Sequence, residues 1–220
     1  MARQRQYDLI VFDWDGTLSD STALIVKSIQ AACRDMGVEV PDRARAAHVI
    51  GLSLLKAVAE IAPDLEEEAL MRMAERYRYH FLAGDHELEL FEGARELLDD
   101  LKGQGYLLAV ATGKARRGLD RAMASMGLNE VFHATRCADE SFSKPHPGML
   151  LELMDEFVTE PSRTLMVGDT THDLLMAQNA GVASLAMSYG AHPVEVLESA
   201  SPEAILHSIS DLRNWLETHG

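Results

Sequence analysis

Short apolar runs, each ending on a small or polar residue, alternate with segments of helical periodicity along most of the chain. Runs of strand length fall at Leu9–Phe12, Leu107–Ala111, Leu165–Val167, Ala183–Met187 and, more weakly, Val131–Thr135. The helical patterns between them span Gly93–Lys102, Ala115–Met126, Pro147–Phe157 and Asp173–Ala180. Strands that are apolar on both faces are typical of a parallel sheet covered by helices on both sides. The alternation therefore predicts an α/β fold with a doubly wound, Rossmann-like parallel sheet.

One stretch interrupts this alternation. Residues 19–87 have helical periodicity at Ser21–Met36, Leu54–Ala62 and Leu65–Phe81, and they contain no convincing strand. A crossover between parallel strands needs only about a dozen residues, far fewer than this stretch contains. We therefore predict that residues 19–87 form an inserted α-helical cap domain, and that residues 1–18 and 88–220 form the α/β core.

The charge of the chain limits its partners. With 20 Lys and Arg against 35 Asp and Glu, the formal net charge is −15, whereas the 47% hydrophobic and 25% charged contents are ordinary for a globular protein. A negative field repels nucleic-acid backbones and anionic lipid surfaces, so we expect neither nucleic acid nor membrane as a partner. An anionic substrate has to be attracted by a local cation.

The cysteines and the apolar segments predict a cytoplasmic protein. Cys33 and Cys137 lie far apart without a CxxC motif, which indicates two free, reduced thiols. No apolar segment of the kind found in secretion signals follows the basic N-terminus. The longest uncharged stretch, 174–194, is broken by polar residues and glycines and does not have the pattern of a membrane span. The oligomeric state stays open between monomer and homodimer.

Polar residues gather where the predicted strands end, which is where open parallel sheets bind their ligands. The segments concerned are Asp13–Thr17, Thr112–Lys114, Ser143–Pro145 and Gly168–Asp173. Taken singly, Asp173 is as readily a helix cap as a catalytic group, and Lys144 has the pattern of a solvated surface lysine. Asp13 and Asp15, however, place like charges beside a buried strand, and such crowding needs a cation. The joint arrangement predicts a functional site.

Together these segments resemble the haloacid dehalogenase-like hydrolases, and specifically the phosphatases with a helical cap after the first strand, such as phosphoglycolate phosphatases. The resemblance covers essentially the whole chain. Asp13-Trp14-Asp15-Gly16-Thr17-Leu18 resembles the first motif of the family, Thr112 the second, Lys144 the third, and Gly168-Asp169 with Asp173 the fourth. Leu90–Gly93 is similar to the phosphoglycolate phosphatase branch.

The resemblance implies hydrolysis of a small phosphorylated metabolite through an aspartyl-phosphate intermediate. Asp13 would be the nucleophile, and Asp15 would first protonate the leaving group and then deprotonate water. Lys144 would balance the charge of Asp13 and the phosphoryl group. The phosphate oxygens would be held by Thr112, Gly113 and Thr17, while the ring of Trp14 is expected to pack. Asp15 argues against dehalogenation, since expelling halide needs no proton donor.

A divalent cation is the implied cofactor. Four carboxylates face one lysine, and a hard, oxygen-ligated Mg²⁺ suits such a site. By resemblance, the metal-binding residues are Asp13 and Asp169 through their carboxylates and Asp15 through its backbone carbonyl. Asp173 would act indirectly or through water.

Substrate choice is expected to come from the cap, because the core supplies only phosphoryl chemistry. The candidates are His48, Gly51, Leu52 and Ser53 in the cap, with Lys114, Arg116 and Arg117 after the second strand. A β-phosphoglucomutase-like phosphotransferase or a pyrophosphatase would share every core motif. From another class, a phospho-acceptor signalling module stays an alternative, which the long helical insertion and Asp15 disfavour.

Overall fold

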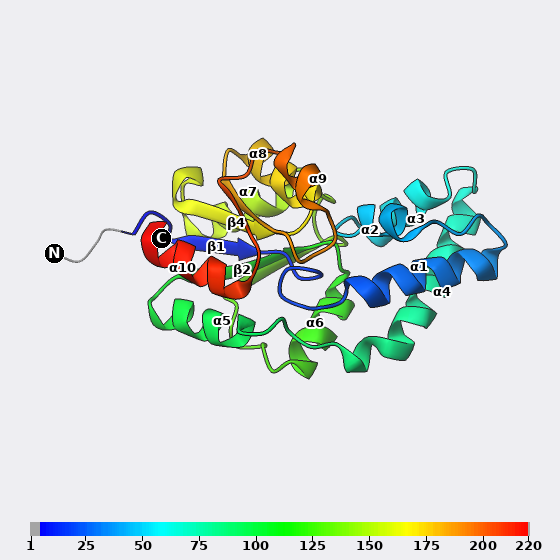
Figure 1. Cartoon of the computed structure of the whole chain (residues 1–220), viewed down its shortest axis with the longest axis horizontal. Helices are drawn as coiled ribbons and strands as arrows, with labels where there is room; N and C mark the ends of the chain where they lie inside the picture. Colours follow the sequence, from blue (N-terminus) through cyan, green and yellow to red (C-terminus); the bar gives the residue numbers. More distant parts are fainter. Residues whose placement is uncertain (1–4, 220) are drawn as a thin grey trace.

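A six-stranded parallel sheet with the strand order β3-β2-β1-β4-β5-β6 runs through the computed structural model, which describes residues 5–219 (Figure 1). Its strands are β1 (Leu9–Phe12), β2 (Leu107–Thr112), β3 (Ala134–Cys137), β4 (Thr164–Gly168), β5 (Ala183–Met187) and β6 (Ala204–Leu206). The chain winds outward from β1 to β3 and then returns to β4 on the other side of β1. This reversal confirms the doubly wound fold, and it locates the ligand-binding edge of the sheet between β1 and β4.

Strand β1 lies at the centre of the sheet, and its four residues are fully buried. Leu9 and Val11 belong to the apolar cluster on one face, whereas Ile10 and Phe12 belong to the cluster on the other. A strand that is buried on both faces has to be apolar throughout. Polarity begins at Asp13, whose backbone N–H donates to the Val167 carbonyl of β4 (2.9 Å).

Helices cover both faces of the sheet (Figure 1). One face carries α5 (Ala94–Gly103), α6 (Arg116–Ser125) and α10 (Ile209–His219), and the other carries α7 (Gly148–Phe157), α8 (Thr171–Ala180) and α9 (Val194–Glu198). Short 3₁₀ turns occur at Asp85–Glu87 and Pro161–Arg163. Trp14 lies in the first of these layers, 1% exposed and edge-on to Phe132, so its ring packs as expected.

Four further helices lie between β1 and α5 in the chain and form one end of the molecule (Figure 1). They are α1 (Thr22–Met36), α2 (Arg43–His48), α3 (Leu54–Ile61) and α4 (Glu67–Gly84). Their inward side chains form an apolar cluster of their own. The chain leaves and re-enters the sheet layer at one seam, where Ser19 pairs with Leu90 in an antiparallel bridge and Phe91 N–H donates to the Leu18 carbonyl (2.9 Å).

The structure corrects several predicted elements. Strand β3 runs from Ala134 to Cys137 rather than from Val131 to Thr135. Val131 and Phe132 precede the strand, and they are apolar because they pack into the apolar cluster on one face of the sheet. The short elements α2, β6 and α9, and the terminal helix α10, have no counterpart in the sequence analysis. The outer limits of the predicted core, Met1 and Gly220, lie outside the described residues. Within 5–219 no helix combines the length and apolarity needed to cross a bilayer.

Candidate active site

Three fully buried charges form the floor of the site. The Lys144 ammonium lies 2.7 Å from Asp13 Oδ1 and 2.6 Å from Asp173 Oδ1, and none of the three side chains is more than 1% exposed. Asp13 follows β1, Asp173 lies in the first turn of α8, and Lys144 comes from the loop before α7. The structure therefore brings together three residues that the sequence separates widely, and it overturns the single-residue interpretation of Lys144 as solvated.

Burial and mutual charge set the protonation of this group. Burial raises the pKa of Asp13 to about 7, and the carboxylates of Asp173 and Asp15 add to this effect while Lys144 opposes it. For Lys144 burial disfavours the charged form, but the neighbouring carboxylates outweigh it and raise the pKa of the ammonium. The lysine accordingly remains charged, and it stabilises the negative charge of the acids on either side.

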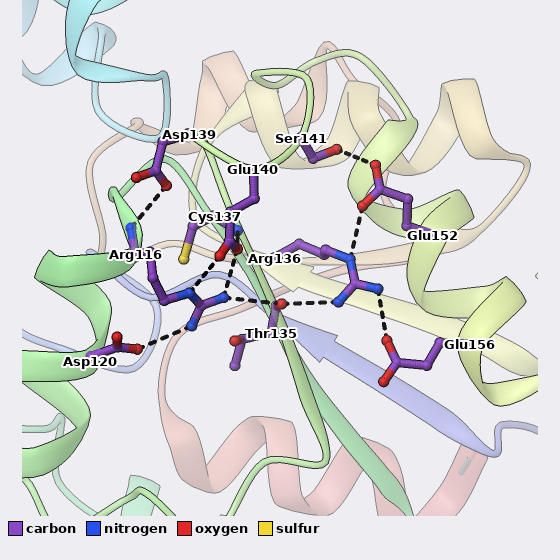
Figure 2. Close-up of polar contacts among 10 residues, drawn as sticks. All are labelled: Arg116, Asp120, Thr135, Arg136, Cys137, Asp139, Glu140, Ser141, Glu152 and Glu156. Atoms are coloured by element: carbon purple, nitrogen blue, oxygen red, sulfur yellow. Dashed lines mark hydrogen bonds and ion pairs between the residues drawn. The ribbon is translucent and has the colours of Figure 1, made fainter.

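The loop that carries Lys144 is fastened by ion pairs at the edge of the sheet (Figure 2). Arg136 of β3 donates to Glu152 (2.8 Å) and Glu156 (2.7 Å) of α7, and Glu152 also accepts from the Ser141 hydroxyl (2.6 Å). Arg116, a candidate for contacting substrate, instead forms a two-pronged pair with Glu140 (2.8 and 2.7 Å). Its charge is thus engaged in holding the loop and does not reach the cavity.

The Asp169 carboxylate, which follows β4, is hydrogen-bonded through both oxygens and closely packed against two glycines. Its Oδ1 accepts from the Thr17 hydroxyl (2.8 Å), and its Oδ2 accepts from the Ala191 backbone N–H (2.7 Å). A Cβ atom on Gly16 or Gly190 would overlap this carboxylate, and Gly16 also has a positive φ of 86°. Thr17, predicted to hold phosphate, therefore orients Asp169 in this structure.

The carboxylates at this edge fit a hard cation. Oxygens of Asp13, Asp169 and Asp173 lie within 4.8 Å of one another, and Asp13 Oδ2 is buried without a hydrogen-bond partner among the described residues. Burial, with Asp13 and Asp173 nearby, raises the pKa of Asp169. An unpartnered oxygen in a self-repelling acidic cluster is what a divalent cation relieves. The Asp15 side chain does not belong to this cluster.

Asp173 also caps a helix, as one interpretation of the sequence held. Its Oδ2 accepts from the Thr170 backbone N–H (3.1 Å) and hydroxyl (2.7 Å), which completes a capping box at the start of α8. Since Oδ1 is bound to Lys144, both oxygens of Asp173 have protein partners. Asp173 therefore differs from Asp13, whose Oδ2 has no partner among the described residues.

Asp15 lies on the wall of a cavity, 8% exposed, with two partners. The Lys114 ammonium is 2.9 Å from both of its oxygens, and the Ser21 hydroxyl donates to Oδ1 (2.7 Å). Lys114 also lies over the ring of Phe81 in α4, 4.7 Å from its centre. Lys114, a candidate for contacting an anionic substrate, is thus occupied by Asp15.

The cavity lies between the sheet edge and helices α1, α3 and α4 and has a volume of about 510 Å³. Asp13, Asp15, Thr112 and Gly113 line it from the sheet side. The Thr112 oxygen accepts from Lys114 N–H (3.2 Å), which leaves the hydroxyl proton available to a ligand.

Not every predicted specificity residue reaches this cavity. Gly51, Ser53 and Arg117 line it, and the carbonyls of Gly51 and Leu52 approach Gly113 so closely that a Cβ there would overlap them. The His48 side chain is exposed and lies outside the lining.

His48 instead joins a group of three histidine rings. Its ring stacks on His192 (4.9 Å between centres), and its carbonyl accepts from His172 Nε2 (2.8 Å) and His192 Nε2 (3.1 Å). Because His192 Nδ1 accepts from Thr171 N–H (3.1 Å), the proton of the neutral ring lies on Nε2. Two histidines that follow β4 and β5 thus hold one carbonyl of the helical segment.

Comparison with known proteins agrees with this geometry. Residues 10–187 match the family model described as haloacid dehalogenase-like hydrolase. The chain belongs to the haloacid dehalogenase-like hydrolase family. A relative named probable phosphatase IndB, from Dickeya dadantii, is 37% identical over 209 residues, which are 93% of this chain and 91% of the relative. The phosphoglycolate phosphatase of Aliivibrio fischeri is 30% identical over 90% of this chain and 91% of its own length.

The fold agrees as well. The crystal structure of a hydrolase from Pseudomonas syringae superposes with a TM-score of 0.88 at 23% identity, covering 97% of this chain and 98% of that one. Membership of the haloacid dehalogenase-like family, together with relatives named as phosphatases, makes this chain a hydrolase of the phosphatase type.

Within this family fold, sequence reasoning missed three contacts of the site. Ser21 precedes α1 and has the pattern of a helix cap, yet its side chain makes no capping bond and binds Asp15. The Ala191 amide and the hydroxyl of Thr17 both bind Asp169. Ser21, three residues after the first motif ends at Leu18, is the one side chain whose contact the sequence could have indicated, whereas a backbone amide gives no such signal.

Lys144→Met should destabilise the protein strongly. Removing the ammonium leaves Asp13 and Asp173 buried side by side without a counter-charge, a type of change that costs about 3–5 kcal/mol. Urea unfolding at neutral pH measures the loss. Lys27→Met is the matched control, because Lys27 is exposed on α1, and we expect a change within about 0.5 kcal/mol. Equal stabilities of the two variants would contradict the inferred role of the buried charge.

Proposed function

We propose that the protein is a Mg²⁺-dependent phosphatase that hydrolyses a small phosphorylated metabolite through an aspartyl-phosphate intermediate. One observation carries the proposal: the buried carboxylate of Asp13 has an oxygen without a partner among residues 5–219, at the edge of a cavity that Asp15 also lines. A nucleophile and an acid-base group facing one space are the minimum that two-step phosphoryl transfer requires.

In the first step a carboxylate oxygen of Asp13 attacks phosphorus, and the ester P–O bond breaks. Asp15 gives its proton to the departing alkoxide oxygen. In the second step Asp15 takes a proton from water, the water oxygen bonds to phosphorus, and the bond to Asp13 breaks to release phosphate. The Lys114 ammonium lies 2.9 Å from Asp15 and holds this carboxyl group at the wall of the cavity through both steps.

Other residues bind and orient. Lys144 stabilises negative charge on Asp13 and on the phosphoryl group, and the Thr112 hydroxyl with the Gly113 amide can hold phosphate oxygens. Mg²⁺ would be held by the carboxylates of Asp13 and Asp169 and by the Asp15 carbonyl. When bound, it supplies positive charge that lets an anionic carboxylate approach a phosphate dianion.

The proposal includes the organisation of the chain. Residues 1–18 and 88–220 would act as the core and 19–87 as the cap, a division supported by the separate apolar cluster of α1–α4 and by the single seam at Ser19 and Leu90. A cytoplasmic location is supported by the two cysteines, both free and buried. Phosphoglycolate is the first compound to test, with sugar phosphates and pyrophosphate in the same panel.

Asp13→Asn should abolish turnover, because an amide is a far weaker nucleophile than a carboxylate. We expect phosphate release to fall by more than a hundredfold, which corresponds to about 2.7 kcal/mol. Circular dichroism and thermal unfolding check that the variant is folded. A folded variant that retains more than about a hundredth of the wild-type kcat would rule out the covalent mechanism.

Asp15→Asn should separate the two steps. It removes the proton donor for an alkoxide, so alkyl phosphates should become inert. 4-Nitrophenyl phosphate has a good leaving group, and its first step should suffer less. Stopped-flow absorbance should then show a burst of nitrophenolate followed by slow turnover. Near-normal rates on alkyl phosphates would contradict the acid-base role.

Mg²⁺ should stabilise the folded protein as well as activate it. The acidic cluster repels itself, and a cation bound at a hundredfold excess over its Kd adds about 2.7 kcal/mol. The melting temperature should rise with Mg²⁺ and fall with chelator. Ca²⁺, which takes more ligands at longer distances, should raise it without supporting turnover. Asp169→Asn is the control that should lose the shift, and full activity in chelator would refute the metal dependence.

A further inference from the structure

The cavity beside Asp13 and Asp15 has a wall that phosphoryl chemistry does not need. Opposite the sheet edge, most of its lining is formed by apolar side chains of α1, α3 and α4, to which α4 adds the phenol of Tyr77 and the exposed Arg78. Those that lie deepest are between 1% and 7% exposed: Ile25, Ile29, Val58, Ile61 and Phe81. At about 510 Å³ the cavity has the size of a typical small-molecule site, which is lined mainly by apolar groups with a few polar ones.

None of the cations that line this cavity among the described residues is buried within its apolar wall. Lys114 is paired with Asp15, and Arg121 is paired with Asp85 (2.8 Å). Arg78 and Arg117 are exposed, and neither has an ion-pair partner within residues 5–219. They can attract a phosphate dianion toward a protein of net charge −15. No buried cation of the described chain awaits a second anionic group beside Ile29 or Val58.

The wall therefore discriminates among phosphate esters by the chemistry of their alcohol. A carboxylate or second phosphate lying against Ile29, Val58 or Ile61 would lose its hydration and meet no buried cation of the described chain there, which is costly. An alkyl chain or an aromatic ring would instead release water from both surfaces. Each methylene group buried in this way is worth roughly a fourfold gain in affinity.

We propose that the substrate is the phosphate monoester of an apolar alcohol, whose alkyl or aryl group lies against the α1, α3 and α4 wall while its phosphate meets Asp13. This inference rests on the proposed phosphatase function and narrows its substrate class. It also gives Phe81 a second role, since the same ring that lies beneath Lys114 forms part of the wall.

A homologous series tests the wall without changing the chemistry. Ethyl, butyl and hexyl phosphate have leaving groups of nearly equal basicity, so they differ only in apolar surface. With Mg²⁺ present, kcat/KM for phosphate release should rise from ethyl to hexyl phosphate by roughly a hundredfold or more. Phosphoglycolate and pyrophosphate are measured in the same assay.

Two variants locate the effect. Leu55 and Leu82 line the cavity from α3 and α4 and are half exposed (50% and 46%), so replacing them should not unfold the protein. In Leu55→Gln and Leu82→Gln the ratio of kcat/KM for hexyl over ethyl phosphate should fall by at least about threefold. Leu151→Gln is the matched control: Leu151 is 48% exposed on α7, outside the cavity, and should keep the wild-type ratio.

The outcomes separate the two proposals. If every ester is hydrolysed at a similar rate, or phosphoglycolate is preferred tenfold over hexyl phosphate, the apolar-alcohol inference is overturned and the phosphatase function stands. A ratio that falls equally in the Leu151 variant also overturns it. If neither the esters nor pyrophosphate release phosphate in the presence of Mg²⁺, the proposed function itself fails.

Discussion

The ammonium group of Lys144 is the interaction on which the site depends. Removing an ion from water costs several kcal/mol even in a real protein interior, and here three ions are buried together. The arrangement is stable because one cation touches both Asp13 and Asp173 at hydrogen-bond distance. The same contacts join the end of β1, the start of α8 and the loop before α7. The contacts that neutralise the buried charges therefore also fix the positions of these three chain segments relative to one another.

The cavity combines two opposite surfaces. Its sheet side is charged and rigid, because each carboxylate there is fixed by partners such as Ser21, Thr17 and the Ala191 amide. Its helical side is mainly apolar, and Arg78 of α4 is the charged side chain that it contributes. The charged groups proposed for the reaction and the apolar surface proposed for the alcohol therefore lie on different elements. Phe81 links the two surfaces, because its ring belongs to the apolar side and also lies beneath the Lys114 ammonium that pairs with Asp15.

The fold and the gathering of acids at one edge could be predicted because both follow from local pattern. Apolar runs ending in Asp13, Thr112 and Gly168 determine which side chains meet at the carboxyl ends of parallel strands. Burial of Lys144 could not be predicted, since it depends on a partner 131 residues away. The hydrogen bond from the Thr17 hydroxyl to Asp169 could not be predicted either, because the sequence does not show which side of a loop faces Asp169. Short elements such as β6 and α9 lack enough residues for a period to be recognised.

The seam at Ser19 and Leu90 restricts twisting of the helical segment relative to the sheet. A body attached through one extended strand can swivel and twist freely about it. Here two antiparallel connections lie side by side and share hydrogen bonds, from Phe91 N–H to Leu18 and from Asp20 N–H to Glu89. Twisting would break those bonds, whereas bending across both strands would not. Bending of α1–α4 across the seam would instead have to break the hydrogen bonds that His172 and His192 donate to the His48 carbonyl.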